Sequence, residues 1–136
     1  MKKYNLLKSL PKSKRNVTKR ESLKTNFHID ISRKYDKDYF DGDRSYGYGG
    51  YKYDGRWRPV AKDIIKYYSL KEGDKFLDIG CAKGFLVKDL LNLGIDSYGI
   101  DISRYALDNS DKELAGRLHL GSADDLPFTD NSFDAV

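Results

Sequence analysis

The chain has 136 residues with a net charge of +4, and 39% of the residues are hydrophobic. A chain of this length forms one domain at most, and it has no apolar run long enough to cross a membrane, which excludes a protein with a helical span. Its lysine-rich start lacks the apolar core of a signal peptide and its single cysteine cannot form an internal disulfide, so we expect a cytoplasmic location.

The charge is distributed unevenly along the chain. Residues 1–34 hold 11 lysine or arginine residues and 2 acids, whereas residues 35–136 hold 14 and 19. A segment with one sign of charge and few apolar residues buries too little surface to order itself, so we predict a basic, mobile arm over residues 1–34. Binding of nucleic acid, anionic lipid or an acidic partner by this arm stays open as an alternative that the sequence does not favour.

Residues 35–57 are dense in tyrosine and glycine. We predict that this segment folds over a ligand as a lid, because aromatic faces attract cations. An aromatic flap packed on the edge of a sheet and a surface for stacking nucleic-acid bases are the alternatives. The five aromatic residues that carry this prediction are Tyr46, Tyr48, Tyr51, Tyr53 and Trp57.

From residue 58 onward, helical and strand periodicities alternate. Helices are predicted to begin near Pro59, Gly84 and Ser103, and Gly73 is predicted to end the first of them. Short apolar strands are predicted at residues 76–79, 97–101, 117–123 and 133–136. Strands and helices that alternate at this spacing predict a parallel sheet with crossover helices, which is a doubly wound α/β fold over residues 58–136.

Three acids stand at the carboxyl ends of the first three strands: Asp78, Asp101 and Asp124. Ligands of doubly wound sheets bind at these ends. Gly80 and Gly84 allow the backbone to approach a ligand closely, and the helix that follows directs free N–H groups toward it. Asp101 lies where the ribose-binding acid of a dinucleotide site is expected, and its carboxylate can accept two hydrogen bonds from a diol.

The loop "GCAKGF" departs from the fingerprint G-x-G-x-x-G of nicotinamide-binding domains. Ala82 stands at its second glycine and Phe85 at its third. An acid at Asp78, two residues before Gly80, would repel a pyrophosphate but attract a cation. S-adenosylmethionine, which joins an adenosine to a positively charged tail, fits both observations.

Residues 75–136 resemble the first half of a class I S-adenosylmethionine-dependent methyltransferase domain of the type 11-like kind. "LDIGCAKG" resembles the family's glycine-rich first motif, "YGIDIS" its second-strand motif, and "GSADDLPFTDNSFDAV" its third-strand segment. The resemblance implies a Rossmann-like fold, S-adenosyl-L-methionine as cofactor, and methyl transfer to an unidentified small-molecule or sugar-related acceptor. The cofactor-binding residues that it implies are Asp78, Gly80, Cys81, Ala82, Gly84, Asp101, Ile102, Ala123, Asp124 and Asp125.

Within that set, the resemblance implies that Asp101 binds the ribose hydroxyls. It also implies that Asp124 meets the adenine amino group, with the backbone of Ala123 or Asp125 at the ring. Lys83 is a candidate for neutralising the carboxylate of the ligand, although solvent exposure is the ordinary expectation for a lysine. The sequence predicts no catalytic residue, no metal ligand and no particular oligomeric state.

The resemblance further implies that the domain is incomplete in this sequence. The family's sheet has seven strands, whereas the sequence stops as the fourth begins, so we expect the N-terminal, cofactor-binding part of the domain. The isolated chain is expected to be unstable or associated and to show no measurable methyl transfer. The alternatives are an inactive nucleoside-binding module or partner subunit and, less favoured, a nucleic-acid-modifying protein.

Overall fold

The structure is a computed structural model that describes residues 3–12 and 17–136. The predicted basic arm therefore lies partly outside the described residues, at 1–2 and 13–16. In the part of the chain that is described, no helix has the length and apolar character needed to cross a bilayer.

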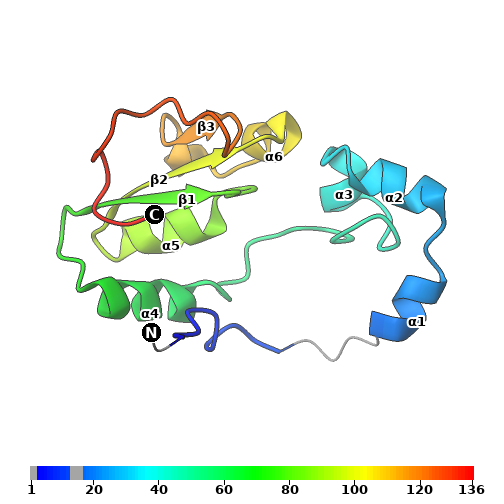
Figure 1. Cartoon of the computed structure of the whole chain (residues 1–136), viewed down its shortest axis with the longest axis horizontal. Coiled ribbons are helices and arrows are strands. Elements are labelled where there is room, and N and C mark those ends of the chain that lie inside the picture. The colour runs from blue at the N-terminus through cyan, green and yellow to red at the C-terminus, as the bar shows by residue number, and fades with distance from the viewer. Residues whose placement is uncertain (1–2, 13–16) are drawn as a thin grey trace.

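A parallel sheet forms the centre of the molecule (Figure 1), with the strands β1 (Lys75–Ile79), β2 (Asp96–Asp101) and β3 (Leu118–Leu120) in that spatial order. Parallel neighbours need a crossover connection, and the helices α5 (Phe85–Asn92) and α6 (Arg104–Asp108) lie in the two connections. This arrangement confirms the predicted α/β fold with a parallel sheet.

The last residues of the chain lie along the free edge of β1. Phe76 faces Ser97 of β2 on one side and forms a parallel bridge with Ala135 on the other. The N–H of Leu77 donates to the carbonyl of Ala135 over 3.1 Å. The chain end therefore pairs with β1 on the side opposite β2.

The third strand is shorter than predicted, because its residues after Leu120 turn away from the sheet. The hydroxyl oxygen of Ser122 accepts the N–H of Asp124 over 3.2 Å, and the Ser122 carbonyl accepts the N–H of Asp125 over 3.3 Å. Local side-chain bonds of this kind compete with strand pairing. Ala123 therefore belongs to a turn.

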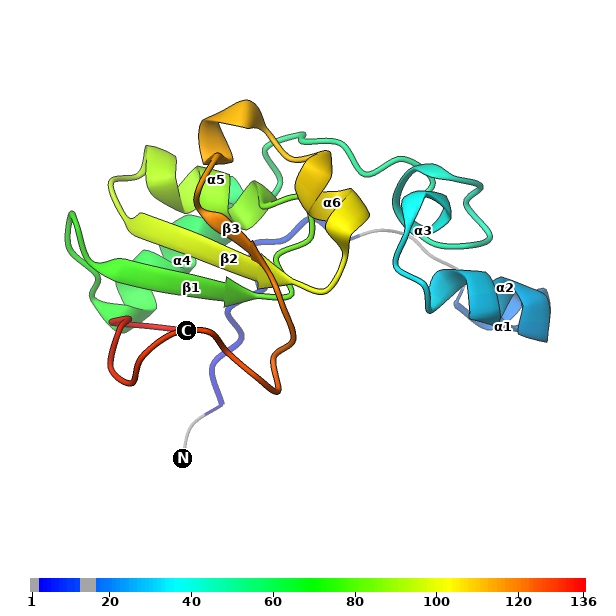
Figure 2. The same cartoon turned by 90° about the horizontal axis from the view of Figure 1, so that it is seen from above.

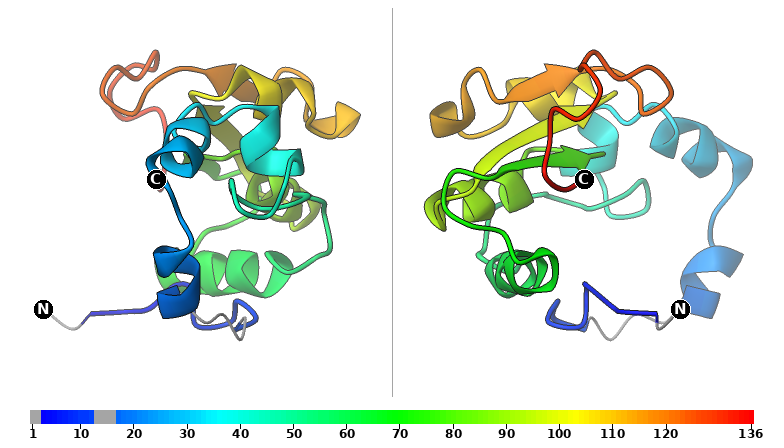
Figure 3. Two further views of the ribbon diagram at one scale, coloured as in Figure 1. Left: turned by 90° about the vertical axis from the view of Figure 1, so that its right-hand side faces the viewer. Right: turned by 60° about the vertical axis from the view of Figure 1, so that its left-hand side comes forward.

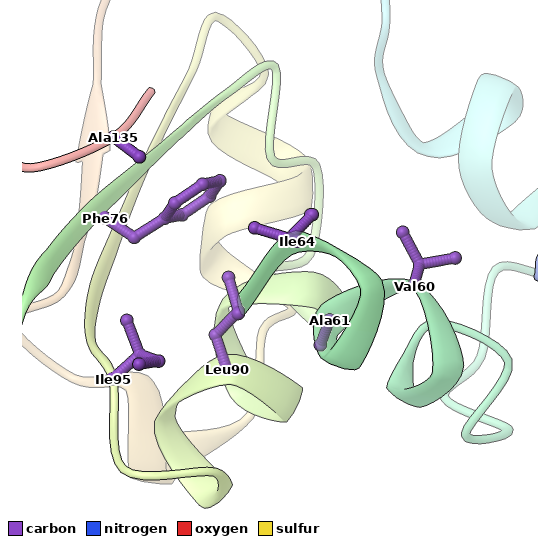
Figure 4. Close-up of a cluster of buried hydrophobic side chains, with 7 residues drawn as sticks. All are labelled: Val60, Ala61, Ile64, Phe76, Leu90, Ile95 and Ala135. Carbon is purple, nitrogen blue, oxygen red and sulfur yellow. The ribbon is translucent and has the colours of Figure 1, made fainter. Parts of the chain in front are cut away.

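The helix α4 (Arg58–Tyr68) precedes β1, and both α4 and α5 lie below the strands in Figure 1. Phe76 points toward Ile64 of α4 and Leu90 of α5 (Figure 4). These three residues belong to a buried cluster that also contains Val60, Ala61, Ile95 and Ala135. Burial of this cluster, which the apolar spacing of α4 predicts, fixes α4 and α5 against β1.

The end of α4 differs from the prediction. The helix ends at Tyr68, and Ser69 takes a left-handed conformation (φ 55°) as its C-cap. Gly73 lies further on, in the turn before β1, where its N–H donates to the carbonyl of Gly94 over 2.9 Å. The predicted end at Gly73 was wrong because a non-glycine residue adopts the capping conformation.

Three short helices precede the sheet: α1 (Val17–Ser22), α2 (Asn26–Ser32) and α3 (Lys37–Asp41). The hydroxyl of Thr25 accepts the N–H of His28, and the His28 ring accepts the N–H of Thr25, so α2 begins with a capping box. These helices stand beside the sheet domain at the right of Figure 1.

Residues 3–12 run below α4, as both views of Figure 3 show. Leu6 and Leu10 pack against the buried cluster beneath the sheet, and the ring of Tyr4 stacks on Tyr67 with centroids 4.5 Å apart. The start of the predicted arm therefore contacts the domain, while its mobility in solution stays a prediction.

Candidate cofactor site

The loop between β1 and α5 has a left-handed backbone at three positions: Gly80 (φ 81°), Ala82 (φ 51°) and Gly84 (φ 76°). The N–H groups of Gly80 and Cys81 donate to the carbonyl of Ile100 over 2.8 and 3.1 Å, so the loop is tied to β2. Ala82 stands where the glycine-rich first motif of the methyltransferase family has its middle glycine. The positive φ of Ala82 explains why a glycine suits this position.

The two glycines of this loop face different surroundings. A Cβ atom at Gly80 would have no atom within 4 Å, so this position opens to a ligand. A Cβ atom at Gly84 would lie 2.8 Å from Leu114 and 2.9 Å from Leu118. Gly84 therefore allows close packing of α5 inside the protein, in place of the approach to a ligand that we expected.

Asp101 joins the two loops at the carboxyl ends of β1 and β2. One of its carboxylate oxygens accepts the N–H of Ala82 over 2.7 Å, and the other accepts the N–H of Ser103 over 2.8 Å. Each oxygen can accept a further hydrogen bond. Asp101 can therefore bind a diol while it holds the loop in place.

Asp78 is a partly buried acid at the same edge of the sheet. Among the described residues, none donates a hydrogen bond to its side chain. Burial, and to a smaller extent the charge of Asp101, raise the pKa of the Asp78 carboxyl to about 7. A desolvated carboxyl beside a second acid is stabilised by a cation, which is the ligand type that the sequence predicted.

A cavity of about 240 Å³ lies against these strand ends. One side comes from four predicted cofactor-binding residues and the other from an aromatic wall of α3 and its neighbours. The residues that line it are Gly80, Ala82, Asp101 and Ile102 on the first side and Tyr35, Tyr39, Phe40 and Tyr48 on the second. The structure therefore brings together four predicted residues of the first two motifs, whereas Asp78, Cys81 and Gly84 do not line this cavity.

Cys81 is buried next to Gly99, where an added Cβ atom would lie 2.6 Å from the Cys81 sulfur. Burial raises the pKa of its thiol far above the usual value, which favours the protonated, less nucleophilic form. Cys81 therefore fills space behind the loop.

The third motif does not line the cavity. Ala123, Asp124 and Asp125 are exposed in the turn after β3. The turn starts beside Asp101, whose carbonyl accepts the N–H of Gly121 over 3.0 Å. The three residues are thus near the site through the backbone, without forming its wall.

Lys83 points away from the position that the sequence suggested. Its ammonium group is 2.6 Å from a carboxylate oxygen of Asp41 and donates to the carbonyl of Tyr51 over 2.9 Å. The residue is buried, with 6% of its surface exposed. Lys83 therefore binds the tyrosine-rich segment, and it does not face the cavity.

The five aromatic residues of the predicted lid have separate positions. Tyr48 lines the cavity, Tyr51 stacks on Phe85 with centroids 4.6 Å apart, and the Tyr53 hydroxyl donates to Asp89 over 2.5 Å. Tyr46 lies against His28, and Trp57 packs on the buried cluster below the sheet.

Sequence reasoning missed Tyr35, Tyr39, Phe40 and Asp41. The many aromatic residues of the segment 35–57 marked it as unusual. No local sequence pattern showed which of its side chains face the cavity.

Comparison with known proteins places residues 77–136 in a family described as "Methyltransferase domain". Demethylmenaquinone methyltransferase of Symbiobacterium thermophilum is 33% identical over 92 residues, which are 60% of this chain and 37% of that protein. Demethylmenaquinone methyltransferase of Lactobacillus johnsonii is 36% identical over 90 residues, 59% of this chain and 36% of that protein.

Two solved structures are also similar over 54% of this chain, each with a TM-score of 0.49. The MccD protein is 27% identical and is covered over 36% of its length. A candidate methyltransferase from an antibiotic biosynthesis pathway of Anabaena variabilis is 24% identical and is covered over 30%. The chain spans little more than a third of the length of the curated relatives that it matches. Residues 77–136 thus match part of a methyltransferase domain.

Proposed function

We propose that the cavity at the strand ends binds S-adenosylmethionine and that the full-length protein transfers a methyl group from it. The observation that carries this proposal is the placement of two acids at one edge of the sheet. Asp101 holds the loop and has free acceptor capacity, and Asp78 accepts no hydrogen bond from any residue in the described part of the chain. The first suits a ribose diol and the second a positively charged tail.

Each residue then has a defined task. Asp101 accepts the ribose hydroxyls, the backbone at Gly80 approaches the ligand, and Asp78 faces its cationic end. A cation beside Asp78 favours the ionised carboxylate and so lowers the pKa of that group. Asp124 and the backbone of Ala123 or Asp125 would contact the adenine from the turn after β3.

The sulfonium supplies an already activated methyl group. The protein therefore has to align acceptor, methyl carbon and sulfur and to exclude water. We assign no general base among the residues that the structure describes. Tyr35, Tyr39, Phe40 and Tyr48 supply a wall of the cavity whose faces favour a cation or a flat ring.

We propose a small molecule as the acceptor. Both curated relatives are named for methylation of demethylmenaquinone, which favours a small-molecule acceptor over a macromolecule. A sugar-related acceptor is the second candidate. A cytoplasmic location remains a prediction from the sequence.

The test is calorimetric titration of the full-length protein with S-adenosylhomocysteine. Asp101→Ala removes the ribose acceptor and should weaken binding by about 1.5–3 kcal/mol, the scale of hydrogen bonds to a charged group. Asp130→Ala, at an exposed acid outside the cavity, is the control and should bind as the wild type does. Asp101→Asn, which keeps one acceptor oxygen for the loop, checks that weaker binding does not come from a misfolded loop.

Undiminished affinity in both Asp101 variants would refute the site. Binding by the full-length protein without turnover of any small-molecule acceptor would instead favour the inactive nucleoside-binding module.

A further inference from the structure

Asp41, the last residue of α3, accepts hydrogen bonds from three separate parts of the chain. One carboxylate oxygen accepts from the Lys83 ammonium over 2.6 Å and from the Tyr105 hydroxyl over 2.8 Å. The other accepts the N–H of Tyr51 over 3.0 Å. A single carboxylate thus connects α3, the cofactor loop, α6 and the tyrosine-rich segment.

The charges of Lys83 and Asp41 stabilise this connection because each side chain is largely removed from water. The Lys83 side chain is 8% exposed and that of Asp41 24% exposed, so neither charge is fully solvated. Burial acts to raise the pKa of the Asp41 carboxyl, but hydrogen bonds from Lys83, Tyr51 and Tyr105 together hold it below its usual value. A buried lysine without its carboxylate would be strongly unfavourable, so the loop needs Asp41 in place.

Asp41 directly follows two residues of the cavity wall, Tyr39 and Phe40. The Phe40 side chain is 2% exposed, and its ring lies 5.9 Å from Tyr51 and 6.4 Å from Tyr105 between centroids. Figures 1 and 2 show α3 beside α6, which carries Tyr105. Fixing Asp41 therefore fixes the backbone that presents the wall.

A second connection lies at the other end of the wall. The Ser103 hydroxyl donates to the carbonyl of Tyr35, and the Ser103 N–H donates to Asp101. Lys83 directly follows Ala82 and Ser103 directly follows Ile102, and both Ala82 and Ile102 line the cavity. Both connections thus join the aromatic wall to residues next to the opposite side of the cavity.

We propose that Asp41 is a positioning residue of the cofactor site, and that Asp41 and Lys83 hold the aromatic residues 35–48 as a fixed wall of the cavity. This rests on the proposed function, because it assumes that the cavity takes S-adenosylmethionine. It differs from a lid that opens and closes freely, since opening would break the ion pair between Lys83 and Asp41 and the hydrogen bond from Tyr105.

The experiment measures S-adenosylhomocysteine binding to the full-length protein with Asp41→Asn. The substitution keeps the shape of the side chain and removes its charge, and we expect about ten- to a hundredfold weaker binding with a faster dissociation rate. Amide exchange should accelerate in residues 35–57 while β1 and β2 stay protected. Asp54→Asn is the matched control, because Asp54 lies in the same segment and pairs with an exposed Arg56; it should change affinity less than twofold.

Two further variants separate positioning from general destabilisation. Asp41→Glu restores the charge and should recover part of the affinity. The double variant Asp41→Asn with Lys83→Met buries no unpaired charge, so it keeps the test valid if Asp41→Asn alone fails to fold. We expect the double variant to fold and still to bind the probe more weakly than the wild type.

The outcomes are distinct for the two proposals. A wild-type protein that does not bind S-adenosylhomocysteine overturns the proposed function. Wild-type binding that is unchanged in Asp41→Asn, or in the double variant, overturns the role of Asp41 and leaves the proposed function standing.

Discussion

The two sides of the cavity are held in place by different interactions. On the β1–β2 side, backbone pairing sets the register from Lys75 opposite Asp96 to Ile79 opposite Ile100, so each residue's place follows from its place in the strand. On the side of residues 35–57, individual side chains such as Asp41 and the rings of the segment fix the position. The first side should therefore be sensitive to volume and backbone conformation, and the second to the loss of single polar groups.

The largest effect is expected from a methyl group at Gly84. Gly84→Ala places a Cβ atom against Leu114 and Leu118 and also forces a left-handed alanine, which together should lower the free energy of unfolding by about 2–5 kcal/mol. Gly80→Ala has the same kind of backbone strain but free space, so about 1–2 kcal/mol is expected. Urea denaturation of both variants measures the difference, and equal losses would contradict the packing role of Gly84.

The next effect concerns the pH dependence of stability. Because the folded-state pKa of Asp78 is about 7, above its ordinary value of 3.8, the folded protein keeps a proton that the unfolded chain releases. Stability should therefore fall as pH rises from about 4 to about 7 and then level off.

Asp78→Asn tests this interpretation. It should remove that dependence and make the ligand-free protein about 2–4 kcal/mol more stable at pH 8, while it weakens cofactor binding. Denaturation of both proteins at several pH values measures the effect, and a flat profile for the wild-type protein over pH 4–7 would show that Asp78 is ordinarily ionised.

A smaller effect is expected on the aromatic side, from Tyr53→Phe. The substitution removes the hydroxyl that donates to one carboxyl oxygen of Asp89, a residue that is 1% exposed. The other oxygen of Asp89 has no partner in the described part of the chain, so the buried carboxyl would be left unsatisfied at about 1–3 kcal/mol.

Tyr67→Phe is the control for this prediction, since Tyr67 is 47% exposed and contacts its neighbours through its ring. Thermal or urea denaturation should show little change for it. If both substitutions cost the same, the Tyr53 hydroxyl does not hold the segment.

Much of the β1–β2 side could be predicted from the sequence. The apolar run before Gly80 and the acid at Asp101 stand at spacings that strand and helix geometry sets. These local periodicities do not depend on which distant residues come into contact. The aromatic side could not be predicted, because its contacts join distant residues: Lys83 lies 42 positions from Asp41, and Tyr105 lies 64 positions from it. No local periodicity encodes such a pair.

The sequence by itself determined the parallel α/β sheet, the methyltransferase motifs and the acids at the strand ends, because backbone periodicity and glycine conformation are local properties. The tertiary structure alone decided that Gly84 serves packing and that Lys83 turns from the ligand toward Asp41. It also decided that Tyr35, Tyr39 and Phe40 form the wall of the cavity. The physical reason is that burial and charge pairing depend on which distant residues come into contact, and a local pattern does not specify those contacts.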